Sequence, residues 1–321
     1  MTAADPTATS QADRRRLMST LLTLAAPLAV LAVGVGLALS WRGELPDPVA
    51  THWGTEGVDG VGSFSTSLVV PVVVVLLFTA GTSALTLRWG QAALTRRLAA
   101  GIAVWFAVVQ TGVLVGSLAV QRGLEDAFLA PGIGGPLALT FVLATVLAVG
   151  AGLLVPGDPV SPARAGIPAD APRLPLAPTE RVSWVRRTTQ RHAWTIVAGA
   201  VAFALTLGTL TRLWWLTLVL VLGLGAILVG SLRWTVTVDA NGLVARSALG
   251  FRVRVPLAEV EGARVSAVAP VRQFGGWGLR IGAAGTVGII TRKGEGLEVS
   301  RSQDRRLVVT VDDAATGAAL L

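Results

Sequence analysis

The 321-residue sequence contains no cysteine and only two histidines. The absence of cysteine excludes disulfide bonds, thiolate metal sites and thiol nucleophiles, and it leaves the redox compartment open. Charged residues are also scarce, at 14% of the chain, whereas hydrophobic residues make up 52% and the mean hydropathy is +0.66. Ordinary soluble domains carry about 25% charged residues. The composition therefore predicts a polytopic membrane protein.

Long apolar stretches define the expected membrane helices. A helix needs about 20 mainly apolar residues to cross a hydrocarbon core about 30 Å thick. Six stretches meet this requirement: Leu17 to Ser40, Thr66 to Leu87, Leu98 to Val120, Ile133 to Val155, Ala193 to Leu210 and Leu213 to Leu232. The first follows three arginines like a signal peptide, but its apolar part is long and no small-residue cleavage site follows, so we predict a retained helix.

The arginines predict an orientation, because short cytoplasmic loops collect Lys and Arg. Before the C-terminal region, the N-terminus and the alternate loops contain 12 arginines, and the loops between them contain three, which are Arg42, Arg122 and Arg212. We therefore expect both termini in the cytoplasm. The net charge of +8 is then a property of cytoplasmic loops, and nucleic acid is not expected as a partner.

The sequence LPDPVATHWGTEGVDG, residues 45–60, is a polar insert that we expect to face outward. It supplies the outer contact candidates, which are Asp47, His52, Trp53, Glu56 and Asp59. A metal site is one alternative, but a single imidazole is a poor donor set for zinc. No serine or cysteine nucleophile accompanies the histidine in a recognisable motif. We favour a compact loop in which His52 and Trp53 pack onto the membrane surface.

Several residues of this insert occur in a known pattern, namely Leu45-Pro46, Pro48, Thr51-His52-Trp53, Gly57, Asp59-Gly60 and Ser63. Placed after a first membrane helix, they resemble the bacterial membrane family called domain of unknown function sixteen forty-eight. The same unit opens the SdpI-type toxin-immunity proteins. The resemblance covers about residues 20–90 and implies two helices joined by this loop. Ala50, Gly54 and Val58 depart from the family pattern, and the later helices do not clearly continue as the later SdpI region.

The segment between the fourth and fifth apolar stretches is rich in proline and arginine. Residues 155–178 contain seven prolines, which predicts an extended cytoplasmic linker. Residues 179–192 follow and supply the inner-face lipid or partner contact candidates Arg181, Trp184, Arg186 and Arg187. This pattern predicts either a short helix on an anionic inner leaflet or simple stop-transfer charges.

From Arg233 onward the hydrophobic pattern alternates, as in a β meander with one solvated face. Further strands are expected at about residues 262–268, 278–282, 286–291, 297–301 and 306–311, with a terminal helix capped by Asp312 or Asp313. The region resembles bacterial pleckstrin-homology-like (PH-like) domains, which implies a curved sheet closed by a helix without catalysis. Trp277, in the bend FGGWGLR, is a further inner-face contact candidate.

Two further patterns, one in the expected membrane helices and one in the C-terminal domain, are less specific. Gly112 and Gly116 form a GxxxG spacing that permits close helix approach within the bundle or in a dimer. The arginines at 252, 254, 264, 272 and 280 have three alternatives, namely nucleic acid, lipid headgroups or solvent, and attachment to a membrane favours the last two. No expected span carries a charge near its centre, which disfavours ion coupling.

The expected fold is an α-helical polytopic membrane protein with six transmembrane helices plus a small C-terminal β-rich PH-like domain. Its parts are a disordered cytoplasmic N-terminus (1–16), a two-helix unit with the outer loop (17–90), helices three and four (91–155), a Pro-rich linker with the interfacial segment (156–192), helices five and six (193–232) and the cytoplasmic β domain (233–321).

The expected role is non-catalytic sensing, signalling or immunity at the cell envelope. The alternative is a transporter or lipid-handling protein without ion coupling. We expect the lipid bilayer, an extracytoplasmic peptide or lipid, and a cytoplasmic protein as partners. No cofactor or metal is expected, and a homo-oligomer is left open.

Overall fold

A computed structural model of the full chain divides into two compact units, residues 1–157 and 158–321. It describes the chain except residues 1–14, 16, 91, 159, 164–170, 172, 176, 178, 191–192, 212–213, 215–216, 219–220, 224, 226–229, 231–232 and 283–285. The expected disordered N-terminus and much of the sixth apolar stretch, Leu213 to Leu232, therefore lie outside the described residues. Each unit is treated separately below.

The first unit contains helices of membrane-spanning length. Four helices are long and apolar enough to cross a membrane: Leu17–Ser40, Phe64–Trp89 (α3), Ala93–Ala119 (α4) and Gly134–Leu154 (α5). The first of them includes a π-helical turn, η1 (Leu21–Ala25), followed by α2 (Ala26–Ser40). The first four expected spans are thus confirmed as helices that are long and apolar enough to cross a membrane.

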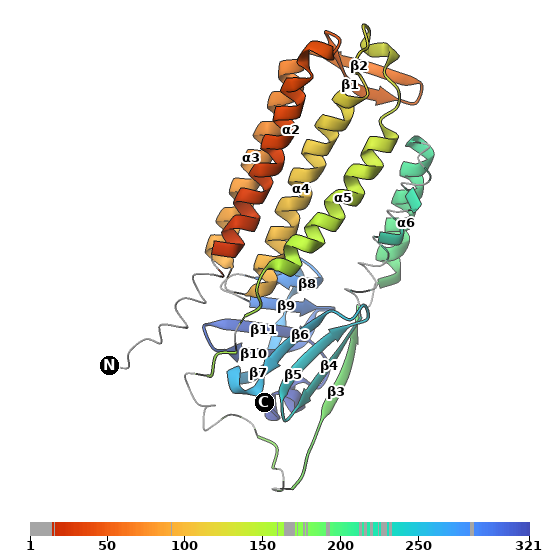
Figure 1. Ribbon diagram of the computed structural model, residues 1–321. Coiled ribbons are helices and arrows are strands. Elements are labelled where there is room, and N and C mark those ends of the chain that lie inside the picture. The colour runs from red at the N-terminus through yellow and green to blue at the C-terminus, as the bar shows by residue number, and fades with distance from the viewer. Residues whose placement is uncertain are drawn as a thin grey trace, which may run out of the picture. The chain divides into compact units, whose positions relative to one another are not determined.

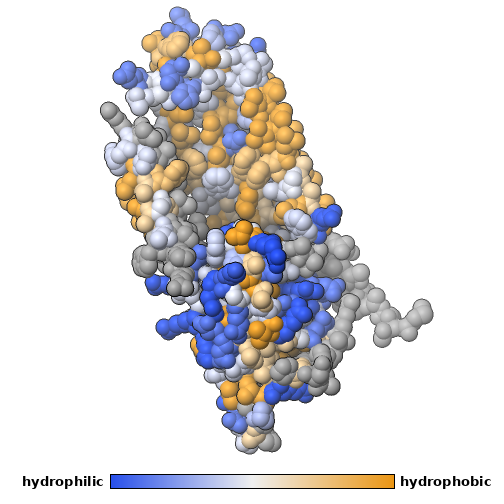
Figure 2. Space-filling view, turned by 180° about the vertical axis from the view of Figure 1, so that it is seen from behind, coloured by the Kyte–Doolittle hydropathy of each residue, from blue (hydrophilic) through white to orange (hydrophobic). Residues whose placement is uncertain are grey.

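The helix α4 is the centre of this unit, where it packs against α2, α3 and α5 (Figure 1). Its neighbours turn large apolar side chains outward, such as Leu77 of α3 and Leu153 of α5, which are 69% and 75% exposed. Figure 2 shows hydrophobic residues along the sides of these helices and hydrophilic residues gathered at the end that carries the hairpin described below. Such an apolar outer surface suits a hydrocarbon environment.

Small residues set the spacing of the helices around α4. A Cβ atom added to Gly34 of α2 would lie 2.0 Å from the Thr111 methyl group of α4. Cβ atoms at Gly112 and Gly116 would lie 2.5 Å from Thr140 and 2.8 Å from Pro136, both of α5. The GxxxG spacing therefore serves close packing of α4 against α5 within the bundle, because only glycine leaves room for the neighbouring side chain.

A β-hairpin fills the loop between α2 and α3. Strands β1 (Val49–Gly54) and β2 (Gly57–Gly62) pair antiparallel, with Gly57 at a φ of +127° in the turn. Two short 3-10 turns lie nearby in the structure, η2 (Arg42–Glu44) before the hairpin and η3 (Ala127–Leu129) between α4 and α5. The helix α3 begins directly after the hairpin, where the Ser63 hydroxyl accepts a hydrogen bond from the Thr66 amide at 3.2 Å.

The second unit begins with a four-stranded antiparallel sheet that corrects one expectation. Its order is β3 (Trp184–Thr189), β4 (Arg233–Asp239), β5 (Gly242–Ser247) and β6 (Arg252–Pro256). Residues 184–189 were expected as a short interfacial helix or stop-transfer charges; they form a strand because every residue pairs with β4. The sheet thus extends to a segment far before residue 233, where the β domain was expected to begin.

An apolar stretch of the chain separates β3 from β4. It contains the helix α6 (Ala193–Thr211), of which Val197–Thr206 is an apolar helix shorter than the four long ones. A Cβ atom at Gly208 would lie 2.3 Å from the Thr217 hydroxyl, so α6 packs closely against the segment that follows it. The β domain is therefore interrupted by an apolar helical insertion between its first two strands.

The second sheet has five strands in the order β7-β10-β11-β9-β8. They are β7 (Val260–Val268), β8 (Gly278–Ile281), β9 (Thr286–Ile290), β10 (Gly294–Arg301) and β11 (Arg305–Thr310), and only β9 and β11 pair parallel. The short elements η4 (Leu257–Glu259), α8 (Pro270–Phe274) and α9 (Ala314–Ala319) complete the unit. The five strands expected after the meander and the terminal helix are confirmed to within three residues at each end.

The alternating pattern of the first sheet places one face in the core. Trp234, Val236 and Val238 of β4 are 3%, 0% and 0% exposed. Their cross-strand neighbours include Trp184 of β3 and Ala245 of β5, which are buried as well. A period of two along each strand thus sorts buried from exposed residues, as the sequence predicted.

Candidate functional site: the hairpin cap

The hairpin cap consists of the hairpin β1–β2, the segment 41–48 before it and the loop 120–131 between α4 and α5. It contains all five outer contact candidates. It sits at one end of the four long helices (Figure 1). The contacts below show how the helices hold it in place and which side chains it leaves exposed.

Gln121, at the end of α4, fixes the hairpin to the helices. Its Oε1 accepts a hydrogen bond from the Ala50 amide at 2.6 Å, and its Nε2 donates to the Ala50 carbonyl at 3.1 Å and to the Ser117 carbonyl at 2.8 Å. Gln121 is completely buried and Ala50 is 2% exposed. Because a buried backbone group without a partner is costly, one amide side chain here satisfies both polar groups of Ala50.

A second attachment joins the loop after α4 to the segment after α2. The Arg122 guanidinium donates to Glu44 Oε2 at 2.8 Å and lies 4.7 Å from the centre of the Trp41 ring. The Gly123 amide donates to the Glu44 carbonyl at 2.7 Å. Both side chains of the ion pair are about half exposed, so the pair orients the two loops and contributes little stability.

Trp53 follows His52 in β1, where the pairing with β2 is irregular. The Trp53 indole donates from Nε1 to the Pro131 carbonyl at 3.1 Å, which ties the hairpin to the segment before α5. Trp53 is only partly exposed. It therefore acts as an anchor of the cap, with a remaining surface open to contact.

His52 and Asp59 form the exposed polar pair of the cap. The His52 Nδ1 contacts Asp59 Oδ1 across the two strands, and the side chains are 72% and 55% exposed. Glycines make room for the pair, because a Cβ at Gly54 would lie 2.5 Å from the Asp59 carboxylate and one at Gly60 would lie 3.0 Å from the His52 Cβ. An imidazole and a carboxylate are therefore both accessible at the surface of the cap.

The other two polar candidates, Asp47 and Glu56, do not join this pair. Both are exposed, and neither has a side-chain hydrogen bond or ion pair with another described residue. Among the described residues no group of three His, Asp or Glu side chains is close enough to share a metal ion. The structure thus brings together only His52 and Asp59 of the four residues considered as metal ligands.

Two of the inner-face candidates, Trp184 and Arg186, lie together at the C-terminal helix of the second unit. The Trp184 indole is 4% exposed, and its Nε1 donates to Asp313 Oδ2 at 3.1 Å. Arg186 pairs with the same oxygen at 2.5 Å. The hydrogen bond from the Thr316 hydroxyl, then that from Trp184, and the positive charge of Arg186 lower the pKa of Asp313. These candidates hold α9 to the sheet, and Trp184 offers no surface to a lipid or partner.

The remaining inner-face candidates are exposed. Arg187 faces away from the core, on the opposite side of β3 from Arg186. Arg181 is exposed just before β3, and Trp277 is 43% exposed in the bend between α8 and β8. That bend is confirmed, with Gly275 at a φ of +66° and Gly276 at +135°.

A buried charge cluster in the second unit was not expected from the sequence. Glu259 is 2% exposed and contacts Arg301 at 2.5 Å and Arg305 at 3.3 Å; Arg305 is 1% exposed and also pairs with Asp158 at 3.3 Å. The Ser161 amide donates to Glu259 Oε1 at 3.3 Å. This cluster fastens the first residues of the Pro-rich segment to the β domain, so it is structural.

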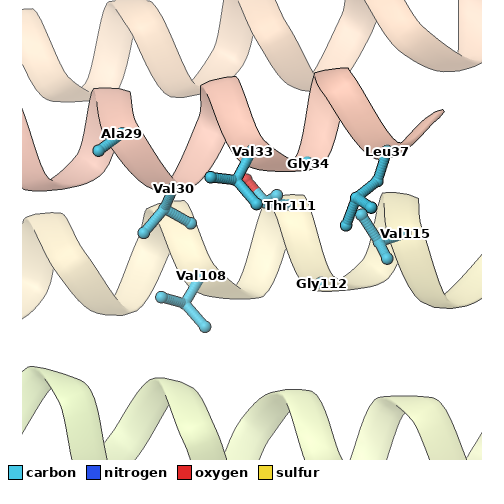
Figure 3. Close-up of a pocket in the computed structure, with 9 residues that line it drawn as sticks. All are labelled: Ala29, Val30, Val33, Gly34, Leu37, Val108, Thr111, Gly112 and Val115. Atoms are coloured by element: carbon cyan, nitrogen blue, oxygen red, sulfur yellow. The ribbon is translucent and has the colours of Figure 1, made fainter. Parts of the chain in front are cut away.

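The first unit also contains an apolar groove between α2 and α4. Its volume is about 410 Å³, and Figure 3 shows its lining residues, Ala29, Val30, Val33, Gly34, Leu37, Val108, Thr111, Gly112 and Val115. Thr111 is 6% exposed, and its hydroxyl has no hydrogen-bond partner among the described residues. A groove with this lining matches a hydrocarbon chain in polarity.

Comparisons with protein-family models, curated proteins and solved structures find no match to this chain. The resemblance of residues 20–90 to the domain of unknown function family and of the C-terminal region to PH-like domains therefore stays a prediction. The site rests on its geometry alone.

Sequence reasoning missed Gln121, the residue that fixes the cap. A signal was present, because an uncharged amide follows directly on an apolar helix, where Lys, Arg or Trp more commonly marks the interface. Its partner Ala50 lies 71 residues earlier, so no local pattern connects the two.

Proposed function

We propose that the chain is a multi-pass protein of the bacterial cytoplasmic membrane, with six spans and both termini in the cytoplasm, whose hairpin cap binds a peptide or lipid outside the membrane. Its role is non-catalytic sensing, signalling or immunity at the cell envelope. A protein partner in the cytoplasm then meets the β domain. Membership of the domain of unknown function family and PH-like character of the β domain are part of this proposal.

The observation that carries the proposal is the contrast within the cap. Gln121 and Trp53 hold the hairpin backbone to α4 and to the segment before α5, at 2.6 Å and 3.1 Å. His52 and Asp59 nevertheless remain 72% and 55% exposed. A fixed backbone with an exposed polar pair lowers the entropy cost of binding, because little has to be ordered when a ligand arrives.

The test compares the double variant H52A/D59A with D47A/E56A in the full-length protein. The first removes the exposed pair, and the second removes two exposed carboxylates of the same loop. We expect loss of envelope-stress survival and of crosslinking to outer partners only with H52A/D59A. If both variants are present at the wild-type protein level and behave like the wild type in both assays, the His52–Asp59 pair has no binding role.

The proposed cytoplasmic partner of the β domain must be tested with the full-length protein. A fragment of residues 233–321 lacks β3, which pairs with β4 along its full length. The full-length protein is used to capture a cytoplasmic partner. Loss of capture with the Trp277→Ala variant, but not with Phe251→Ala, would support a protein contact at the exposed bend. Capture that is indifferent to both variants would place the partner elsewhere.

A second function, lipid handling without ion coupling, is favoured by one observation. The groove between α2 and α4 is apolar, and the only polar atom that the described lining side chains place there is the unpaired Thr111 hydroxyl. Filling the groove with Val33→Trp should slow lipid exchange between vesicles if the groove carries acyl chains. Exchange at the wild-type rate would remove this alternative.

A further inference from the structure

The outer face of the first sheet in the second unit is covered by arginines. The register places Arg187 of β3, Thr235 of β4, Arg246 of β5 and Arg252 of β6 in one row across the four strands. Arg254 of β6 occupies the neighbouring row. Together with Arg233 at the start of β4, these residues form what we call the arginine face, and all five arginines are exposed.

The arginine face has no internal compensation. None of its five arginines makes an ion pair or a side-chain hydrogen bond with a described residue. Arg246 and Arg252 are direct cross-strand neighbours, an arrangement of like charges that destabilises a sheet. Six other arginines of the same unit, at 186, 264, 292, 301, 305 and 306, have carboxylate partners, whereas those at 173, 181, 272 and 280 have none among the described residues but do not share one face with a second arginine in direct register. The face is therefore complementary to an external anionic surface.

The position of the face in the chain identifies that surface. The strands β3 and β4 are the two that flank the apolar insertion, so Arg233 follows the insertion directly. The row of Arg187 and Arg246 lies two residues further along, about 7 Å at the rise of a strand. Anionic headgroups attract basic residues within a Debye length, about 8 Å at physiological salt.

An apolar turn lies at the same end of the sheet. The turn between β5 and β6 exposes Leu249 and Phe251, at 49% and 64%. The Ala248 amide donates to the Arg233 carbonyl at 3.1 Å, and Leu249 contacts Gly230 of the apolar insertion. Exposed leucine and phenylalanine beside cations are the composition of a surface that enters the boundary between headgroups and acyl chains.

We propose that the arginine face and the turn 248–251 bind the anionic phospholipid headgroups of the membrane that holds the apolar insertion. The inference rests on the proposed membrane location of residues 193–232. It assigns the β domain a lipid contact that is separate from any protein partner at Trp277. Neutral lipid would leave the like charges of Arg246 and Arg252 uncompensated.

Because the chain contains no cysteine, a single introduced cysteine can be labelled specifically to test the lipid contact. Full-length protein with Thr235→Cys, which places a reporter within the arginine row, is labelled with an environment-sensitive fluorophore and placed in nanodiscs. One set contains phosphatidylcholine alone, and the other an equal mixture with phosphatidylglycerol. We expect a shift toward an apolar, shielded signal only in the mixed discs, reversed by high salt. The triple variant R246Q/R252Q/R254Q should weaken the response about a hundredfold, because each arginine near the surface contributes roughly fivefold.

A matched variant, R272Q/R292Q/K293Q, removes the same number of charges elsewhere in the unit and should keep the response. Identical signals in the two kinds of disc, or a full response in the arginine-face variant, would overturn the inference. Two further probes are added to phosphatidylcholine discs. The same shift with glycerol phosphate would reveal a site for free phosphate, and a shift with an acidic peptide alone would reveal a protein surface. Either result would overturn the membrane contact.

A second cysteine variant tests separately whether residues 193–232 lie in the membrane. A Cβ at Gly199 of α6 meets nothing within 4 Å, so Gly199→Cys is tolerated by the fold. Protection of this cysteine from an aqueous maleimide, combined with no lipid response at residue 235, would reject the lipid contact alone. Labelling of the cysteine would reject the proposed membrane location and this inference with it.

Discussion

The two units bury polar groups in different ways. In the helical unit one neutral side chain, Gln121, satisfies both buried polar groups of Ala50 in the hairpin cap. In the β unit a buried carboxylate, Glu259, is neutralised by Arg301 and Arg305. A neutral amide side chain can pair with a backbone amide and carbonyl without any charge being desolvated, whereas a buried carboxylate needs cationic partners. The comparison predicts a different cost when each arrangement is broken.

The largest effect is expected from Glu259→Ala. This change leaves Arg301 and Arg305, 11% and 1% exposed, without their shared carboxylate. Removing one partner of a buried ion pair costs about 3–5 kcal/mol, because the remaining charge stays desolvated. Pulse proteolysis of the full-length protein in detergent measures the loss. The exposed carboxylate Asp312, which pairs with Arg292, is the matched control, and Asp312→Ala should cost less than about 1 kcal/mol. Equal costs for the two variants would contradict the structural role of the cluster.

Gln121→Leu should have the next largest effect. The leucine fills much of the same volume but leaves the Ala50 amide and carbonyl buried without partners, which costs roughly 1–3 kcal/mol for each group. Hydrogen exchange of the Ala50 amide should accelerate accordingly. Gln110→Leu provides the comparison, since Gln110 makes no side-chain hydrogen bond with another described residue. If the Ala50 amide stays as protected as in the wild type, Gln121 does not hold the cap.

The glycine contacts of the helical unit can be tested with two positions on one helix. Gly34→Ala puts a methyl group 2.0 Å from Thr111, whereas the same change at Gly36 meets nothing within 4 Å. Overpacking costs about 1–3 kcal/mol, so G34A should lower the thermal stability in detergent. G36A should leave it unchanged or raise it, since alanine favours the helix. A loss of similar size for both variants would mean that helix propensity and lipid contact, and not packing against α4, set the requirement for glycine.

The smallest effect concerns Asp313, at the start of α9. The pKa of Asp313 is lowered by the hydrogen bond from Thr316, by that from Trp184 and by the charge of Arg186. The ionised form is therefore favoured in the folded state, so its contribution is complete above the ordinary pKa of about 4 and is lost as the pH falls through the lower folded value. Trp184 fluorescence in the wild type should change in this acidic range and not near neutral pH.

Asp313→Asn removes the titrating group and should abolish that transition. Asp312→Asn changes the neighbouring, 78% exposed carboxylate and should preserve it. A transition that survives in D313N would assign the titration to another group.

The membrane helices were predictable, because enough apolar residues in a row are a local property of the sequence. The helix ends differ from the expected ones by at most five residues, as in α4, which begins at Ala93 where Leu98 was expected. Ser63, named from the sequence only as part of the family pattern, caps α3. The strands from Arg233 onward were predictable for a similar reason, since their alternation repeats every second residue.

The candidate site was predictable only in part. The residues 45–60 were recognised as a compact loop, and Gly57 does form the turn of a hairpin. The strand that contains His52 and Trp53 was not expected, and the irregular pairing at these residues has no signal in the sequence. The assignment of Trp184 as a surface contact did not foresee its burial against α9, because its partner Asp313 lies 129 residues away.

The sequence by itself determined which segments are apolar enough to span a membrane, where a polar loop interrupts them, and where the alternating strands lie. Each of these follows from the hydrophobicity and spacing of neighbouring residues. The tertiary structure alone decided that β3 joins a sheet whose other strands follow an apolar insertion, that Gln121 holds Ala50, and that five arginines share one face. Those contacts join residues far apart in the chain, and their energy exists only once the backbone has brought the partners together.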